Sequence, residues 1–320
     1  MTTLTIGNRL DKEDTTVQSE HDRQNSITSG HRACQGCGEA LAARCVIDAA
    51  YKVTNGKIAV VNATGCLEVF SCVYPENSWQ VPWLHSLFGN APAVATGVAS
   101  AFRISGDNDM RVIAQGGDGA TCDIGMGCLS GMFDRNDDVL YVCYDNQAYM
   151  NTGVQRSSAT PIYTRTATTL PTAGYIGNAI GTGKNVPEIA MAHGIPYVAT
   201  ASIANIRDLE EKVIKAINTR GARYLHVHVP CPLGWGYQPS ETIRVARMAV
   251  ECGLFPLFEA ENGILVGSTP VDNPKSVEEY LRAQRRFAHL FGKNAPADAI
   301  EALQRMASSN IEKYKLNGGF

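Results

Sequence analysis

Two polar turns, one strand–helix–strand step apart, constrain the fold of this chain more than anything else in the sequence. An apolar run at 112–114 leads into Asp118, which has a glycine on each side. A second apolar run at 139–144 leads into Asp145 and Asn146. Asp118 and Asn146 are 28 residues apart, and a step of this kind joins neighbouring parallel strands. We therefore expect both side chains at the carboxyl edge of one sheet, where ligands bind in open α/β folds.

These side chains suit one kind of ligand. A carboxylate, an amide oxygen and backbone exposed by glycine match Mg²⁺ carrying a diphosphate, because Mg²⁺ takes few protein oxygens and fills its other positions with phosphate and water. The alternative is an ordinary turn around Asp118 that binds nothing, since Asp-Gly turns are common. The sequence thus predicts a site for a metal and a diphosphate, with a ligand-free turn as the competing interpretation.

Strand-like and helix-like patterns alternate along most of the chain. Strands are expected at 57–62, 111–115, 139–144, 197–200 and 224–229, with a strand-like piece at 256–261. Helices are expected from Glu39 and at 91–102, 123–133, 186–193 and 206–218, with two charged helices near 276–290 and 296–315. This alternation predicts an α/β protein with a doubly wound, mostly parallel sheet.

The 320 residues divide into three expected parts. Residues 1–29 are polar and form an N-terminal arm that is either mobile or wrapped on a partner subunit. Residues 30–240 form the α/β domain, and residues 241–320 form a helical segment for packing or subunit contact. Within the domain, residues 151–185 hold many Thr, Gly and Pro and little periodicity, which is typical of a functional loop.

Charge and apolar content argue against several classes of function. The formal net charge is −3 and no basic stripe with interleaved aromatic residues is present, so no nucleic-acid partner is expected. No apolar run reaches the ~18 residues of a membrane span, and the N-terminus lacks the apolar core of a secretion signal. Ten cysteines without such a signal indicate a reducing compartment, so we expect a cytoplasmic protein whose thiols are free or metal-bound.

Four of the cysteines share a setting that the others lack. They lie in glycine or proline turns: Cys34, Cys37, Cys66 and Cys231. The others lie in apolar or helical contexts, where a free cysteine behaves as a small hydrophobe: Cys45, Cys72, Cys122, Cys128, Cys143 and Cys252. Four thiolates from turns at one sheet edge suit a 4Fe–4S cluster or a structural zinc. A thioredoxin-type redox pair at Cys34 and Cys37, or thiols without a ligand, are the remaining alternatives.

Two further patterns are weaker signs of function. The segment 181–185 resembles a phosphate-binding loop, but Asn178 stands where the first glycine belongs, and Asn185 stands where a hydroxyl residue would bind Mg²⁺. His226 and His228 alternate along one expected strand and share a face. We expect them to be core or interface histidines rather than metal ligands.

Four separate motifs occur in the order in which one family has them. They are GHRACQGCGEA at 30–40, NATGC at 62–66, GDG at 117–119 and YDNQAYMNTGVQRS at 144–157. With these motifs the chain resembles the β subunit of the 2-oxoacid:ferredoxin oxidoreductases, and the pyruvate type most closely, from about residue 30 to residue 290. The resemblance implies the diphosphate-binding half of the thiamine-diphosphate-binding fold, together with thiamine diphosphate, Mg²⁺ and one 4Fe–4S cluster.

The resemblance also implies roles for individual residues. The Mg²⁺ ligands would be Asp118, Asn146 and the backbone carbonyl of Ala148. Contacts to thiamine diphosphate would come from Glu39, Cys66, Gly117, Asp118, Gly119, Ala120, Asn146, Ala148, Tyr149 and Asn151. The cluster ligands would be Cys34, Cys37, Cys66 and Cys231, which favours the cluster over zinc. The catalytic residues would be Asn151, close to the reacting carbon, and His31, in proton transfer.

By this resemblance the chain is expected to be the catalytic subunit of an enzyme that oxidatively decarboxylates a 2-oxoacid of the pyruvate type. The thiamine cofactor would form an enamine and pass its electrons to the cluster and then to a ferredoxin-like acceptor. Partner subunits would supply the pyrimidine-side domain, the activating glutamate and a further Fe–S centre. The chain alone is therefore expected to be inactive.

A loop at 162–171 departs from the family pattern. It carries Tyr163 and Arg165, whereas pyruvate enzymes usually have small residues there. An added cation suits a second carboxylate, as in oxalate, and an aromatic residue suits an aryl glyoxylate such as phenylglyoxylate; otherwise Arg165 points to solvent. Two functions of other classes compete: a non-redox thiamine enzyme whose cysteines hold zinc, and an Fe–S electron-transfer subunit without the thiamine cofactor.

Overall fold

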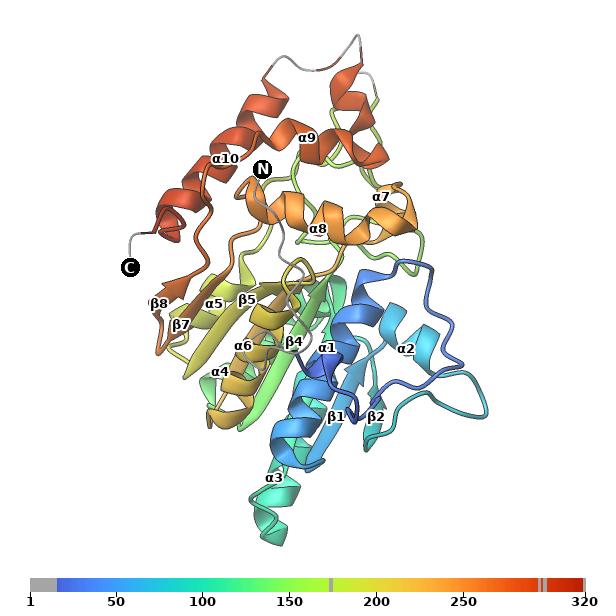
Figure 1. The fold of residues 1–320 in the computed structure, drawn as a ribbon, viewed down its shortest axis with the longest axis vertical. Coiled ribbons are helices and arrows are strands. Elements are labelled where there is room, and N and C mark those ends of the chain that lie inside the picture. The colour runs from blue at the N-terminus through green and yellow to red at the C-terminus, as the bar shows by residue number, and fades with distance from the viewer. Residues whose placement is uncertain (1–15, 173–174, 293–294, 296–297, 319–320) are drawn as a thin grey trace.

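Eight strands form one sheet in the order β2-β1-β3-β4-β6-β5-β7-β8 (Figure 1). The structure is a computed structural model and describes residues 16–172, 175–292, 295 and 298–318. The parallel strands are β1 (Ile58–Ala63), β2 (Trp83–Ser86), β3 (Arg111–Gly117), β4 (Val139–Asp145), β5 (Tyr197–Ser202) and β6 (Arg223–His228). The antiparallel strands β7 (Phe258–Glu261) and β8 (Ile264–Ser268) extend one edge.

Helices cover both faces of the sheet. α1 (Gly38–Thr54) and α6 (Ile206–Asn218) bury one face, and α3 (Ala91–Ser105), α4 (Met126–Asp134) and α5 (Val186–Ala192) bury the other. The central strands β1, β4, β5 and β6 are buried along their whole length, as expected of parallel strands that are covered on both sides. The predicted doubly wound, mostly parallel α/β fold is confirmed.

A further helical layer lies at one end of the sheet (Figure 1). It contains α7 (Pro232–Trp235), α8 (Thr242–Glu251), α9 (Val277–Arg282) and α10 (Ala299–Lys313), with the 3₁₀ turns η4 (Pro239–Glu241) and η5 (Arg285–Phe291). This layer has its own buried core. The helix expected at 276–290 is interrupted and becomes α9 and η5. The segment 241–320 also adds β7 and β8 to the sheet, so it is not purely helical; its role in subunit contact stays a prediction.

Residues 16–29 pack against the helices of the sheet. Val17, in the short turn η2 (Val17–Ser19), and Ile27 are buried. The backbone amide of Val17 donates a hydrogen bond to Oε2 of Glu210 on α6 at 2.6 Å. The amide of Ser26 donates to Oδ1 of Asp48 on α1 at 2.8 Å. The rest of the expected arm, residues 1–15, lies outside the described residues.

No helix in the part of the chain that the structure describes is both long and apolar enough to cross a membrane.

Candidate functional site

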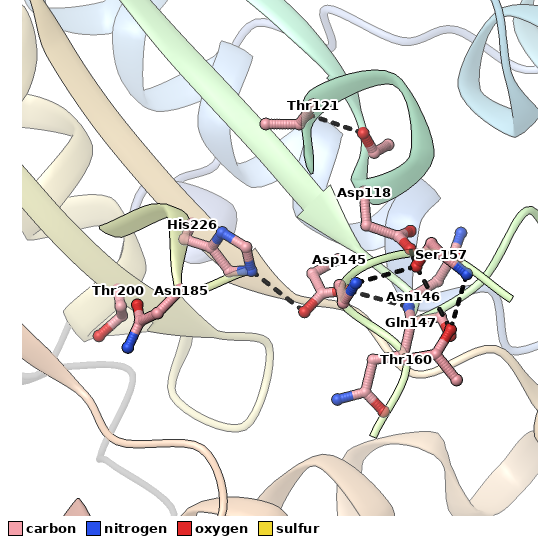
Figure 2. Close-up of polar contacts among 12 residues, drawn as sticks. Asp118, Thr121, Asp145, Asn146, Gln147, Ser157, Thr160, Asn185, Thr200 and His226 are labelled. Carbon is pink, nitrogen blue, oxygen red and sulfur yellow. Dashed lines mark hydrogen bonds and ion pairs between the residues drawn. The ribbon is translucent and has the colours of Figure 1, made fainter. Parts of the chain in front are cut away.

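Asp118 and Asn146 lie side by side, as their spacing predicts. β3 and β4 pair in parallel, with Gly117 opposite Tyr144, so the residues that follow the two strands leave the sheet together. Asp118 is 1% exposed and Asn146 is 6% exposed. Figure 2 shows the two side chains next to each other, beside Ser157. The turn after β3 and the turn after β4 therefore form one buried polar site.

The amide of Asn146 meets two other groups at one point. One end of the amide lies 2.8 Å from the carbonyl oxygen of Ala148 and 3.1 Å from Oδ1 of Asp118. With its nitrogen at that point, the amide donates to both groups. With its oxygen there, three oxygens converge, and the nitrogen donates to Oε2 of Glu39 at 3.3 Å. Oxygens about 3 Å apart are neighbours in an octahedron whose metal–oxygen distances are about 2.1 Å, as for Mg²⁺. The second orientation is thus a cradle for a small cation.

Asp118 is a buried carboxylate held by a neutral hydroxyl group. Oγ of Ser157 donates a hydrogen bond to Oδ2 of Asp118. Burial, and then the charge of Asp145, raise the pKa of Asp118 well above its usual value. The ionised form is therefore poorly stabilised by the chain itself, and a bound cation would compensate its charge.

The chain leaves β3 through a π-helical turn that packs closely on Tyr149. The helix expected at 123–133 begins instead as a π-helical turn, η3 (Gly119–Ile124), before α4. A Cβ atom on Gly119 would lie 2.7 Å from Cε1 of Tyr149, so the tyrosine ring packs directly on the backbone there. The hydroxyl of Tyr149 donates to Oδ2 of Asp123 at 2.9 Å. Gly119 and Tyr149, both assigned to the cofactor by resemblance, are thereby fixed against each other.

Residues 181–185, which resemble a phosphate-binding loop, pack against Asp123 and Ser158. Lys184 Nζ lies 3.3 Å from Oδ1 of Asp123 and donates to Oγ of Ser158 at 3.1 Å. A Cβ atom on Gly183 would lie 1.8 Å from the carbonyl oxygen of Ser158, so the two backbones are in direct contact. The glycine in this segment thus permits a close approach of backbones.

The CxxC turn packs against the segment that holds the fourth turn cysteine. The amide of Gly38 donates to the carbonyl of Pro230 at 3.3 Å, one residue before Cys231. The hydroxyl of Thr242 donates to the carbonyl of Gly36 at 2.7 Å. These contacts bring two turns that are distant in sequence to one place.

The sulfurs of these turns are neighbours that accept backbone hydrogen bonds. Cys37 Sγ accepts from the amide of Ala40 at 3.5 Å, and Cys231 Sγ accepts from the amide of Gly234 at 3.3 Å. Cys66 begins α2 (Cys66–Ser71), a helix where the sequence pattern predicts only a turn. Its thiol pKa is raised by burial, then by the charge of Glu39 and by the other three turn cysteines: Cys231, Cys37 and Cys34.

The four sulfurs do not share a common ligating point. Within the described ranges, no three His, Cys, Asp or Glu side chains are arranged to hold a metal ion. Glu39 lies between the sulfurs and the metal cradle: it is 4% exposed, it accepts the hydrogen bond from Asn146, and it acts on the thiol of Cys66. Burial raises the pKa of Glu39 to about 7. The two candidate centres are therefore joined through one buried carboxyl group.

The two residues expected to be catalytic lie in different surroundings. His31 lines a pocket of about 320 Å³ together with Cys34 and Cys37, on the cysteine side of the site. Asn151 is exposed, in the turn that follows Tyr149. The described residues place neither one in hydrogen-bond contact with Asp118, so their catalytic roles stay predictions.

His226 and His228 are core residues that share a face, as predicted. His226 Nδ1 lies 2.6 Å from the hydroxyl of Tyr224, and its Nε2 lies 3.1 Å from Oδ2 of Asp145 (Figure 2). His228 is fully buried, stacks on Phe255 with ring centroids 4.6 Å apart, and has no hydrogen-bond partner for either ring nitrogen in the part of the chain that is described.

Comparison with known proteins gives consistent matches over nearly the whole chain. Residues 63–227 match the family model for the C-terminal TPP-binding domain of thiamine pyrophosphate enzymes. The chain is 50% identical over 291 residues to pyruvate synthase subunit PorB of Methanosarcina barkeri, covering 91% of this chain and 97% of that protein. It is 37% identical to ketoisovalerate oxidoreductase subunit VorB of Pyrococcus abyssi, covering 91% and 93%.

One solved structure shares the fold over a similar length. It is a 2-oxoglutarate:ferredoxin oxidoreductase from Magnetococcus marinus with 2-oxoglutarate, coenzyme A and succinyl-CoA bound. The match has a TM-score of 0.56 and 21% sequence identity, and it covers 91% of this chain and 96% of that chain.

Proposed function

The chain belongs to the β subunits of the 2-oxoacid:ferredoxin oxidoreductases, and from this premise we propose that it binds the diphosphate end of thiamine diphosphate and performs the oxidative decarboxylation of pyruvate. The family assignment made from the four motifs is confirmed, and the chain is a subunit of an oxidoreductase. The matching TPP-binding domain supports thiamine diphosphate as its cofactor.

The convergence of Asp118, Asn146 and Ala148 carries the proposal. With the amide oxygen of Asn146 turned inward, it lies 2.8 and 3.1 Å from the other two oxygens, the spacing of adjacent ligands around Mg²⁺, whose other positions would be filled by water and the cofactor's phosphates. When bound, thiamine diphosphate supplies the nucleophilic carbon that attacks the 2-oxo group. The chain holds and orients this cofactor through the metal cradle and through Tyr149, which is packed on Gly119.

The four turn cysteines are the proposed ligands of a 4Fe–4S cluster, although their sulfurs do not converge on one point within the described ranges. Amide donors on Cys37 and Cys231 stabilise sulfur that carries negative charge, as in cluster thiolates. Cys66 interacts with all three of the other thiols, and with Glu39, which bonds Asn146. A cluster held by these cysteines would take up electrons from the cofactor and pass them to a ferredoxin-like acceptor. A structural zinc in a non-redox enzyme is the competing assignment for the same sulfurs.

Pyruvate is the proposed substrate because relatives over most of the chain's length are pyruvate synthase subunits, at 50% identity for Methanosarcina barkeri and 39% for Thermotoga maritima. The divergent loop does not oppose this proposal. Arg165 is exposed, and its backbone amide donates to the carbonyl of Arg286 at 3.1 Å. Tyr163 is half-buried, with its amide donating to the carbonyl of Asn178 at 2.7 Å. Both residues make structural contacts through their backbone amides. Their presence in the loop therefore does not imply that the substrate is oxalate or an aryl glyoxylate.

Exposed apolar side chains beside the site support a covering partner subunit. Leu87 is 75% exposed and Ile124 is 61% exposed. The two segments are neighbours: Gly89 follows Leu87 by two residues, and a Cβ atom on Gly89 would lie 2.9 Å from the carbonyl oxygen of Ile124. Ile124 ends the turn that follows Asp118. We propose that a partner covers this edge and supplies the pyrimidine-side domain and the activating glutamate.

The assembled complex with Asp118→Ala tests the metal cradle. The variant should lose thiamine diphosphate on gel filtration, because the only carboxylate of the cradle is gone, and should keep its iron. Retention of the cofactor at normal affinity would refute the Mg²⁺ assignment. Metal analysis of the wild-type complex tests the cluster: about four irons per chain beyond those of the partner's own Fe–S centre, and no zinc, are expected, and zinc in place of these irons would establish the non-redox alternative.

A panel of 2-oxoacids tests the substrate. The wild-type complex is assayed with pyruvate, oxalate, phenylglyoxylate and 2-oxoisovalerate by reduction of a ferredoxin or a viologen dye. The highest kcat/KM is expected for pyruvate. A preference for oxalate or phenylglyoxylate would instead assign Arg165 or Tyr163 to substrate recognition.

A further inference from the structure

Trp235 and Arg286 form hydrogen bonds to the loop that carries Asn146 and Ala148. Nε1 of Trp235 donates a hydrogen bond to the carbonyl oxygen of Asn146 at 2.8 Å. Nη2 of Arg286 donates to Oε1 of Gln147 at 2.7 Å. The guanidinium carbon of Arg286 lies 3.6 Å from the ring centroid of Trp235, so the two side chains form one stacked unit. This unit holds two consecutive residues of the loop.

The loop at 146–148 has an unfavourable backbone conformation at Gln147, which its neighbours must stabilise. Gln147 has φ +66°, in the left-handed region that residues with a side chain seldom adopt. This turn of the backbone is what lets the Asn146 side chain and the Ala148 carbonyl meet 2.8 Å apart. The carbonyl of Gln147 also accepts from Oγ1 of Thr160 at 2.7 Å. A relaxed backbone at Gln147 would separate the metal ligands on its two sides.

Burying the charged side chain of Arg286 at this position is energetically unfavourable. It is 4% exposed, and among the described residues its side-chain hydrogen-bond acceptors are neutral groups: Gln147, Gln284 and Tyr280. Its Nη1 has no hydrogen-bond partner among these residues. A buried cation that is hydrogen-bonded only to neutral groups destabilises a core, and an apolar side chain of similar volume would pack there at lower cost. What the guanidinium adds is a planar stack on Trp235 and a directed hydrogen bond to the loop.

Trp235 also connects the loop with the cysteine side of the site. It is the last residue of α7 and fully buried, and its amide donates to the carbonyl of Cys231 at 2.9 Å. The backbone and the indole of this one residue therefore join the Cys231 turn to the carbonyl of Asn146.

We propose that Trp235 and Arg286 are positioning residues that set the geometry of the metal cradle and thereby the affinity for Mg²⁺ and thiamine diphosphate. This inference rests on the proposed function. The two side chains bond the backbone carbonyl of Asn146 and the side chain of Gln147, not the three oxygens of the cradle, so they act by positioning these oxygens.

Trp235→Phe tests the indole hydrogen bond. The phenyl ring keeps an aromatic surface for Arg286 and removes the N–H donor together with part of the buried ring volume, a loss that the control below shares. In the assembled complex, stripped of Mg²⁺ and thiamine diphosphate, the apparent Kd for Mg²⁺ at fixed thiamine diphosphate should rise about tenfold. Trp79→Phe is the matched control: it removes a buried indole bond to Oγ of Ser71 at 2.9 Å, away from the loop, and should leave the Kd unchanged.

Arg286→Lys tests the guanidinium. Lysine keeps the charge and loses the planar stack and the fixed direction of the donor, so the Kd should again rise about tenfold. Arg223→Lys is the control, since Arg223 is also fully buried but lies at the other end of β6, bonded to Asp138. If Arg286 acts through Gln147, adding Arg286→Lys to a Gln147→Met variant should cause no further rise.

The outcomes distinguish a failure of the proposed function from a failure of the positioning role alone. A wild-type complex that does not retain thiamine diphosphate with Mg²⁺ would overturn the proposed function. A wild-type complex that retains it, with Trp235→Phe and Arg286→Lys binding Mg²⁺ as tightly as Trp79→Phe and Arg223→Lys, would overturn only the positioning role. If Arg286→Lys does not assemble, the Trp235→Phe comparison decides, because its control Trp79→Phe carries the same loss of buried ring volume.

Discussion

Ser157 and Asp118 are joined by a hydrogen bond across 39 residues of sequence. The hydroxyl of Ser157 takes up Oδ2 of the carboxylate, while Oδ1 faces Asn146 at 3.1 Å. The amide of Ser157 donates to Oγ1 of Thr160 at 2.9 Å, which fixes the serine itself. The irregular loop at 151–185 therefore fixes the orientation of the carboxylate and leaves one oxygen free for a metal.

Ser157→Ala should weaken Mg²⁺ binding by about tenfold or more, because a hydrogen bond to a charged group contributes about 1.5–3 kcal/mol. The measurement is an Mg²⁺ titration of the complex at fixed thiamine diphosphate. Ser105→Ala is the control, since that exposed hydroxyl bonds only the carbonyls of its own helix. Equal affinity in Ser157→Ala and Ser105→Ala would show that the hydroxyl does not orient Asp118.

Gly119→Ala should destabilise the chain by about 1–3 kcal/mol, the usual cost of overpacking, and should release thiamine diphosphate. The reason is the 2.7 Å approach of the new Cβ atom to Tyr149. Gly97→Ala in α3 is the opposite case: nothing lies within 4 Å of its Cβ position, so this substitution should stabilise the chain by about 0.5–1 kcal/mol. Denaturant unfolding measures both. A neutral Gly119→Ala variant would mean that Tyr149 can move without consequence.

Cys231→Ser should lower the iron content and bleach the visible absorption of the cluster, because Cys231 is one of four proposed ligands. Cys252→Ser provides the contrast: Cys252 is buried in the core of the C-terminal layer and bonds only the carbonyl of Ala249. That variant should lose stability and keep its iron. Unchanged iron and spectra in Cys231→Ser would remove this residue from the ligand set.

The neighbourhood of Asp118 and Asn146 could be predicted from sequence because it depends on local rules. Apolar runs define β3 and β4, one crossover separates them, and parallel pairing then places the two turns together. The four turn cysteines could also be singled out, since glycine and proline mark turns around them. In both cases the signal lies within a few residues of the functional side chain.

The contacts that shape the site could not be predicted, because their partners are far apart in the sequence. Trp235 bonds Asn146 across 89 residues and Arg286 bonds Gln147 across 139. α2 was missed because a helix of 6 residues shows too little periodicity to recognise. The break between α9 and η5 falls at Gln284, whose side chain bonds Tyr280 and Arg286 within the same segment. No glycine or proline marks this break in the sequence.

His228 should make the folded chain sensitive to acid. Burial lowers the pKa of His228 to about 3, whereas an unfolded histidine has a pKa of about 6.5. Between these values the unfolded chain binds a proton that the folded chain does not. The stability due to neutral His228 is therefore present above about pH 6.5 and is lost as the pH falls, by up to about 1.4 kcal/mol per pH unit.

His228→Phe should remove that acid slope, since the new ring can stack on Phe255 and binds no proton. Unfolding free energies from about pH 4 to pH 9 give the number of protons taken up. His226 on the same strand should not obscure this slope: burial disfavours its charged form, but Cys143 and Asp145 outweigh this and raise its pKa to about 10. Burial also disfavours the Cys143 thiolate, but Cys122 and His226 outweigh this and lower the pKa of Cys143 to about 6. Between these values the proton that His226 holds matches the one that Cys143 gives up, so the pair takes up no net proton on folding. An acid slope equal to that of the wild type would place the sensitive group elsewhere.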